Sequence, residues 1–245
     1  MPQSCIKLAC SVGLTALFVC IKSGAAENIL VENCEIMSLA NNFKIGTETS
    51  GDVRGVEVRN CYFFTAECAG GYAGIAVESA DGAHLSDIYV HDIVMDNVTS
   101  PLLIWLGCRL DKDNGADGEM GGINGVTVEN IDANNIDIGC AVVGCEYKGE
   151  RYLVQNAVVR NVKAVYRDCY EKVKIYRGDK VLEAGMSGYP EITRVSHRYF
   201  ISHSLSAYYD LPVFGICVRD VENFTLGNFE VTPRQGNARP LTNYA

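Results

Sequence analysis

Three acidic side chains, Glu48, Glu78 and Asp81, are the candidates for acid/base catalysis in this sequence. Glu48 follows the segment FKIGT, Glu78 follows GIAV, and Asp81 comes three residues after Glu78. Two carboxyl groups that flank a glycosidic bond, one protonated and one ionised, can cleave it, and a separation of roughly 6.5–9.5 Å admits the attacking water of an inverting reaction. Glu78 is the strongest candidate, because an acid inside an apolar strand pattern has the least structural reason to be there. The structural alternative is that Glu48 binds main-chain amides at a corner and that Asp81 and Gly82 form a turn.

Four further side chains are candidates for binding a substrate. Lys22 and Lys44 hold equivalent places in IKS and FKIG, which predicts two stacked ammonium groups that suit a carboxylate ligand. Trp105, in LLIWLG, is predicted to face outward and to stack on a sugar ring, and Arg109 is a candidate carboxylate partner. The structural alternatives are an exposed lysine column that deters edge association and a tryptophan packed under a loop.

Metal and nucleophile chemistry find little support in the sequence. The eleven cysteines form no Cys-x-x-Cys pair and only four histidines are present, so neither a zinc site nor a cofactor is expected. Cys34 and Cys61 fall at matching places and are predicted to be small apolar residues stacked in a core. The histidines do not accompany a Ser or Cys nucleophile and are expected to be structural: His84, His91, His197 and His203.

The composition fits one sizeable core built from short strands. The chain has 245 residues, of which 48% are hydrophobic and 21% charged, with 24 glycines and only six prolines. Its formal net charge of -9 argues against a nucleic-acid partner, which requires a basic surface. A polyanionic ligand would need a local basic patch, because the net charge of the chain is negative.

A repeated unit must position the candidate side chains. It reads as a polar corner, apolar-x-apolar, two polar residues that end in Asn or Asp, and apolar-x-apolar again. It occurs as NILVENCEI (28–36), GVEVRNCYF (55–63), LSDIYVHDIVM (85–95), INGVTVENIDA (123–133), VQNAVVRNVKA (154–164) and VENFTLGNFEV (221–231). The anchors at the bend are Asn33, Asn60, Asp92, Asn130, Asn161 and Asn228. Most successive anchors are about 30 residues apart, a period typical of solenoids and propellers.

A parallel β-helix fits this repeat best. Alternation with period 2 indicates strands and excludes helical repeats, and the WD and kelch signatures of propeller blades are absent. A second strand set lies between the units, at VCIKSG (19–24), FKIGTE (43–48), GIAVES (74–79), LLIWLG (102–107) and CAVVGC (140–145). Asparagine tolerates the left-handed backbone of a bend, and stacked asparagines would form an internal ladder. We expect five to seven coils, about 4.8 Å apart.

One segment interrupts the repeat. Residues 165–215 are rich in Tyr and charged residues and are predicted to leave the coil stack as an excursion. The tail PRQGNARPLTNYA is predicted to cover the last coil, which would otherwise present an open strand edge.

The segments CIKSG, FKIGTETSGDVRGVEVRNCYF, GIAVESADG, LSDIYVHDIVMDNV and PLLIWLG resemble glycoside hydrolase family 28, the polygalacturonases and their bacterial relatives. The likeness covers about residues 18–165, and LPVFGICVRDVENFTLGNFEV with ARPL resembles the C-terminal coils of bacterial members. Gly46, Glu48 and Gly51 in this order are its most specific feature. The resemblance implies an all-β, single-stranded, right-handed parallel β-helix of the pectin-lyase-like type.

The catalytic signatures of that family are changed here. Ala16 and Leu17 stand where the family carries an Asp-Asp pair, and its Asn-x-Asp strand would precede Met1. The Gly-His-Gly turn reads ANN at 40–42, and Ala76 and Glu78 replace the Arg-x-Lys substrate clamp. A truncated start would explain the missing acids, and a divergent branch would explain the altered clamp.

The N-terminal segment has two interpretations. Residues 1–17 are predicted to be a non-native start or a signal-like segment, since Lys7 precedes the apolar run LACSVGLTALFVC and SGA at 23–25 fits a cleavage site. The run is too short for a membrane-spanning helix. CIKSG resembles an internal strand, so the β-helix domain is predicted to occupy residues 18–245.

The resemblance implies metal-free inverting hydrolysis of pectic, galacturonate-containing polysaccharide, with no nucleic-acid or membrane partner. An extracellular or periplasmic location is expected from the same resemblance. A chain without the family's aspartates can instead be a non-catalytic polysaccharide-binding or structural β-helix. A pectate-lyase-type elimination would need a calcium-binding Asp cluster and an Arg base, which the sequence does not show.

Overall fold

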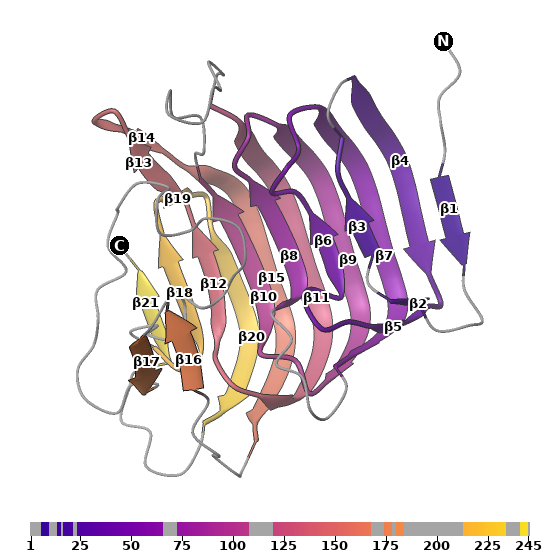
Figure 1. The fold of residues 1–245 in the computed structure, drawn as a ribbon, viewed down its shortest axis with the longest axis vertical. Helices are drawn as coiled ribbons and strands as arrows, with labels where there is room; N and C mark the ends of the chain where they lie inside the picture. The colour runs from indigo at the N-terminus through magenta and orange to yellow at the C-terminus, as the bar shows by residue number, and fades with distance from the viewer. Residues whose placement is uncertain are drawn as a thin grey trace.

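The computed structural model describes residues 6–9, 14–15, 17–21, 24–65, 73–107, 120–167, 174–177, 180–183, 213–233 and 241–244. Throughout these ranges the chain forms strands and turns and no helix (Figure 1). None of these residues therefore forms a helix with the length and hydropathy of a membrane span. The fold is all-β, as predicted.

Two parallel sheets make up most of the described chain. The first sheet contains β1 (Ile6–Ala9), β2 (Leu14–Thr15), β4 (Ala25–Glu32), β5 (Glu35–Met37), β7 (Asp52–Phe64), β9 (His84–Asp96), β11 (Gly122–Ile136), β15 (Val154–Tyr166), β19 (Val221–Glu222) and β20 (Thr225–Thr232). The second contains β3 (Leu17–Val19), β6 (Phe43–Ile45), β8 (Ala73–Ser79), β10 (Ser100–Leu106), β12 (Cys140–Val143), β18 (Ile216–Arg219) and β21 (Thr242–Tyr244).

The chain visits the two sheets in turn, and each visit adds a strand beside the previous one. The order β4, β7, β9, β11, β15 in the first sheet is matched by β6, β8, β10, β12 in the second, with every pairing parallel (Figure 1). This connectivity is consistent with a parallel β-helix. The predicted second strand set is confirmed for its last four members. The first member was predicted at 19–24, but β3 ends at Val19, which pairs with Ile45 at the end of β6.

Left-handed residues bend the long strands of the first sheet. All six predicted anchors have φ between 47° and 57°: Asn33, Asn60, Asp92, Asn130, Asn161 and Asn228. They form one column, because the residues just before and after them pair in register from strand to strand. Each left-handed residue places two consecutive side chains outside, so Val58 and Cys61 are buried whereas Arg59 and Asn60 between them are not. The predicted stacking of Asn33 on Asn60 is thereby confirmed.

The amide ladder lies on the outside of the stack, and the prediction of an internal ladder is wrong. Asn130 Nδ2 donates to Asp92 Oδ1 at 2.9 Å, Asn161 Nδ2 to Asn130 Oδ1 at 3.1 Å, and Asn228 Nδ2 to Asn161 Oδ1 at 3.0 Å. These four side chains are exposed. The reason is geometric: at these bends the left-handed residue lies on the convex side, so its side chain points to solvent.

The core is a set of apolar columns between the two sheets. One column runs through successive rungs as Val31, Val58, Val90, Val128 and Val159, each at most 1% exposed. The next column includes Cys34 and Cys61, both buried, as predicted. Branched side chains suit such columns, because they pack closely along a pleated surface.

The long gap between the last two anchors does not contain another coil of the first sheet. β15 pairs directly with β20, so Asn161 and Asn228 lie on neighbouring rungs. Tyr166 Oη donates to the carbonyl oxygen of Phe214 at 2.7 Å, which holds together the two points where the chain leaves and rejoins the stack. Between them the structure describes Arg167, Val213 and the antiparallel hairpin of β16 (Lys174–Arg177) and β17 (Lys180–Glu183). The rest of the predicted excursion lies outside the described residues.

Two smaller features complete the described chain. β13 (Cys145–Tyr147) and β14 (Glu150–Tyr152) form a second antiparallel hairpin. From the segment predicted to be a non-native start, β1 pairs in parallel with β4, and β2 with β5.

The bend at Asn130 gives a test of the coil geometry. A β-branched residue tolerates φ of 56° poorly, so Asn130→Val is expected to lower the free energy of unfolding by about 1–3 kcal/mol in urea denaturation. Asn130→Gly keeps the backbone and removes only the exposed amide bonds, so its loss is expected to be smaller. If the two variants lose the same free energy of unfolding, the amide ladder, and not the left-handed backbone, accounts for the stabilising effect of Asn130.

Candidate functional site

The predicted site residues belong to the outer face of the second sheet. Alternation along β8, β10 and β12 sends Ile75 and Val77 into the core and Ala76 and Glu78 outward. Register then defines two outer rows. The first is Lys44, Ala76, Leu103, Ala141 and Cys217, and the second is Glu78, Trp105, Val143 and Arg219. These rows are largely apolar and buried, so the charged residues stand among hydrophobic neighbours.

Lys44 and Glu78 form an ion pair within this face. Lys44 Nζ lies 2.9 Å from Glu78 Oε2, and the two side chains are only 12% and 7% exposed. Ala76 is the register partner of Lys44, and Gly46 lies against the backbone of Glu78. A Cβ at Gly46 would come within 1.9 Å of the Glu78 carbonyl oxygen, so only glycine fits there.

Trp105 lies next to Glu78, but the prediction of an exposed sugar platform is wrong. The two residues are direct partners between β10 and β8, and Trp105 is 5% exposed. Its indole lies over Gly107, where a Cβ would meet the ring at 2.1 Å. The side chain is covered because it belongs to the apolar outer cluster with Leu103 and Val143, which burial stabilises.

The two other predicted acids lie at the carboxyl ends of the same strands. Glu48 is exposed in the bend that follows β6, and Asp81 is half-buried in the bend that follows β8. β6 and β8 are parallel neighbours, so Glu48 and Asp81, which follow them, lie at the same edge of the second sheet. Glu78, the last residue but one of β8, lies near this edge as well. The structure therefore brings the predicted acids to one end of two adjacent coils.

The remaining predicted binding residues are not part of this cluster. Lys22 and Arg109 lie outside the described residues. The predicted stack of Lys22 on Lys44 is wrong, because Phe18 occupies the position opposite Lys44. The register of β3 with β6 thus differs by four residues from the expected one.

The corner at residues 40–42 is held by hydrogen bonds to the main chain. Asn42 is buried and its Nδ2 donates to the carbonyl oxygens of Ile36 and Phe64, both at 2.8 Å. Asn41 Oδ1 accepts the amide hydrogen of Ala73 at 2.9 Å. Both amides thus satisfy main-chain groups that would otherwise be buried without partners.

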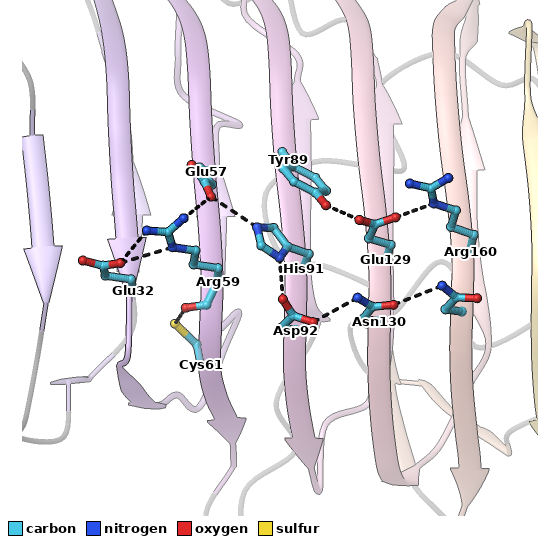
Figure 2. Close-up of polar contacts among 11 residues, drawn as sticks. Glu32, Glu57, Arg59, Cys61, Tyr89, His91, Asp92, Glu129, Asn130 and Arg160 are labelled. Carbon is cyan, nitrogen blue, oxygen red and sulfur yellow. Dashed lines mark hydrogen bonds and ion pairs between the residues drawn. The ribbon is translucent and has the colours of Figure 1, made fainter.

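A second polar cluster, not predicted from the sequence, crosses the outer face of the first sheet (Figure 2). Arg59 binds Glu32 through Nη2 and Glu57 through Nη1, both at 2.8 Å. The imidazole of His91 then links two carboxylates: its Nε2 lies 3.3 Å from Glu57 Oε1 and its Nδ1 2.7 Å from Asp92 Oδ2. Asp92 continues the contacts into the exposed amide ladder.

A shorter chain of contacts runs beside the first (Figure 2). Tyr89 donates its hydroxyl hydrogen to Glu129, which also accepts from Nε of Arg160. The rings of Tyr89 and His91 stack with centroids 4.1 Å apart. These side chains come from three consecutive long strands, so the contacts tie neighbouring coils together.

These contacts lower the pKa of two carboxyl groups of the first sheet, Asp92 and Glu129. A hydrogen bond from His91, and then one from Asn130, lowers the pKa of Asp92. Hydrogen bonds from Tyr89 and Arg160 lower the pKa of Glu129, and the bond to Glu129 is the main reason why the pKa of Tyr89 is raised to about 12. Glycoside hydrolysis needs one carboxyl group that stays protonated, and neither Asp92 nor Glu129 meets that requirement. We therefore interpret this cluster as a structural link between coils.

The sequence did contain a signal for this cluster. The residues before the first five anchors are acidic or basic, in the order Glu32, Arg59, His91, Glu129 and Arg160. Comparison of these positions between repeats would have revealed acidic and basic side chains on one column, because residues one repeat apart become neighbours. The apolar positions alone, which define the fold, carry no such information.

Within the described residues, no group of three or more His, Cys, Asp or Glu side chains is placed to hold a metal ion. Comparison of the chain with protein-family models, with curated proteins and with solved structures finds no match.

The ion pair of the second sheet gives a stability prediction. Lys44→Met removes the ammonium partner of Glu78 among apolar neighbours, and the loss in free energy of unfolding is expected to be about 3–5 kcal/mol. The double variant Lys44→Met, Glu78→Leu replaces the pair by apolar groups and is expected to recover most of that loss. Urea denaturation of the three proteins measures both effects, and a double variant no better than Lys44→Met would contradict the assignment.

The first-sheet cluster predicts acid sensitivity. Because folding lowers the pKa of Asp92 and Glu129, their contribution to stability is complete above the unfolded-state values, near pH 4, and is lost as the pH falls through the folded-state values. Thermal unfolding between pH 7 and pH 2.5 should show a steeper loss of melting temperature for the native chain than for Asp92→Asn or Glu129→Gln. Arg54→Met, which breaks only an exposed pair with Glu27, serves as the control and should leave the slope unchanged.

Proposed function

We propose that this chain is a polygalacturonase-like glycoside hydrolase module that acts on pectic, galacturonate-containing polysaccharide. Its fold is inferred to be a single-stranded, right-handed parallel β-helix of the pectin-lyase type. The alternation between two parallel sheets supports this inference, because crossover connections between parallel strands of one sheet are right-handed in about 98% of cases.

The observation that carries the proposal is the ion pair of Lys44 and Glu78. The sequence pointed to these two residues separately, on two different coils, as a partner for a carboxylate and as an acid. In the fold the ammonium lies 2.9 Å from the carboxylate, and the covered side chain of Trp105 is the register partner of Glu78. A buried ion pair adds little net stability over apolar residues of the same size, so its presence on an apolar face favours a functional reason.

The arrangement suggests a division of roles among the three acids. Glu78, paired with an ammonium group, is suited to act as the ionised base that activates water. Glu48 and Asp81, at the solvent edge of the same two coils, are candidates for the acid that protonates the leaving oxygen. Carboxyl groups one or two coils apart, at about 4.8 Å per coil, span the separation that inverting hydrolysis needs.

The second candidate function is a β-helix that binds polysaccharide without cleaving it. The burial of Glu78 and its pairing with Lys44 favour this reading, since a base must reach the reacting water. Both functions use the same face, and they differ in whether new reducing ends appear.

A reducing-end assay on polygalacturonate and on methyl-esterified pectin tests the proposal. The native chain is expected to release reducing ends, and Glu78→Gln is expected to lose at least about a hundredfold of this activity, the range for a missing general base. Glu27→Gln, an acid on the first sheet, is the matched control and should retain full activity. Binding to the polymers without release would establish the non-catalytic function, and neither binding nor release would end the proposal.

A further inference from the structure

The outer face of the first sheet carries an apolar patch on the carboxyl side of the anchors. There β5, β7 and β9 contribute four outward side chains that register makes neighbours: Met37, Tyr62, Phe64 and Val94. The rings of Tyr62 and Phe64 stack with centroids 5.2 Å apart, and Val94, the partner of Tyr62, is 49% exposed. Apolar side chains that cluster on an exposed face and are rimmed by polar residues are typical of interaction sites.

Three carboxyl groups surround this apolar patch, each one the register partner of a residue in it: Glu35, Asp96 and Asp132. Glu35 and Asp132 are exposed, and Asp96 is half-buried. Burial, and then the negative charges of Asp96 and Glu35, raise the pKa of Tyr62. Carboxylates on both sides therefore act on the patch that lies between them.

Other acids of the same face have cationic partners; the pairs are Glu27 with Arg54, Glu32 with Arg59 and Glu129 with Arg160. No ion pair within the described part of the chain joins one of the three acids around the patch to a cation, although Lys163 is the register partner of Asp132. Asp96 accepts a hydrogen bond from the amide of Asn135, and Asp132 accepts one from the amide of Asn134. The rim of the patch therefore offers negative charge to a partner.

The spacing of these groups defines the shape of a complementary partner. Glu35 and Asp132 end a row in which Tyr62 and Val94 lie between them. At the usual distance between neighbouring strands, the two carboxylates are about 14 Å apart. An extended peptide rises about 3.4 Å per residue, so its side chains four residues apart are about 13–14 Å apart and point to the same side. Two basic residues at this spacing, with an apolar residue midway, match both carboxylates and the patch.

We infer that the apolar patch is an interaction surface for an extended, basic protein segment of the pattern Arg/Lys-x-apolar-x-Arg/Lys, which crosses the strands of the first sheet. Arginine suits both ends of this segment, because its guanidinium group binds carboxylates in a bidentate manner and stacks on aromatic rings. The net charge of -9 also favours a cationic partner. The inference is independent of the proposed function, which concerns the second sheet.

Two blocked, dye-labelled peptides of equal composition and charge, TRTLTRT and TRRTLTT, test this surface. The first has the required spacing, and the second places its two arginines side by side. Fluorescence anisotropy at pH 7 and low salt is expected to show roughly fivefold tighter binding of TRTLTRT, the value of one exposed charge pair. The double variant Glu35→Gln, Asp132→Asn should lose this preference, and Val94→Lys should weaken the binding of TRTLTRT, because it places a like charge in the patch.

The double variant Glu222→Gln, Glu230→Gln is the control for net charge, because it removes two exposed acids from the last strands of the same sheet. It should keep the preference, and thermal unfolding verifies that each variant is folded. Equal affinity of the native chain for both peptides, no binding of either, or equal effects of the two double variants would overturn the inference. Self-association of the native chain that Val94→Lys abolishes would assign the patch to a second copy and would overturn it as well.

Discussion

The register of hydrogen bonds between successive coils is the constraint on which the rest of this structure depends. Each coil pairs in parallel with the next, so side chains one repeat apart become neighbours on a shared column. A slip by one residue would move every valine of the central column from the core to solvent. The left-handed anchors prevent such slips, because they fix the bend of every coil at the same place. Asparagine and aspartate fill this position since they tolerate positive φ better than other residues with a side chain.

The outer faces of the two sheets differ in charge and in burial. The first sheet carries charged side chains, and carboxylates, guanidinium groups and an imidazole pair with one another from coil to coil. These internal contacts would have to be broken by any polar ligand, which makes the part of the face that carries them a poor binding surface. The second sheet presents an apolar outer face with Lys44 and Glu78 embedded in it. Charge on such a face is costly to bury, so the ion pair favours a role in recognition or chemistry over a role in stability.

Several features of the site were accessible from the sequence, and others were not. Glu78 was identified as an acid out of place in an apolar strand, and the structure places it among apolar neighbours in an ion pair with Lys44. The exposure of Trp105 was misjudged, because alternation tells which side of a strand a residue faces but not whether that side is covered. The side of the amide ladder was misjudged for a related reason: periodicity marks the bend, whereas the direction of the bend decides where its side chain points.

The sequence alone determined the periodic part of this protein: the anchors, the two strand sets, the apolar columns and the buried cysteines. These features follow from local preferences that recur at every repeat, so each copy confirms the others. Only the tertiary structure decided the contacts between particular side chains on different coils, such as Lys44 with Glu78 or His91 with Glu57 and Asp92. Such pairs depend on the register between neighbouring strands, as the four-residue shift at β3 illustrates. A periodic pattern fixes which residues face outward, but the coil-to-coil register decides which of them meet.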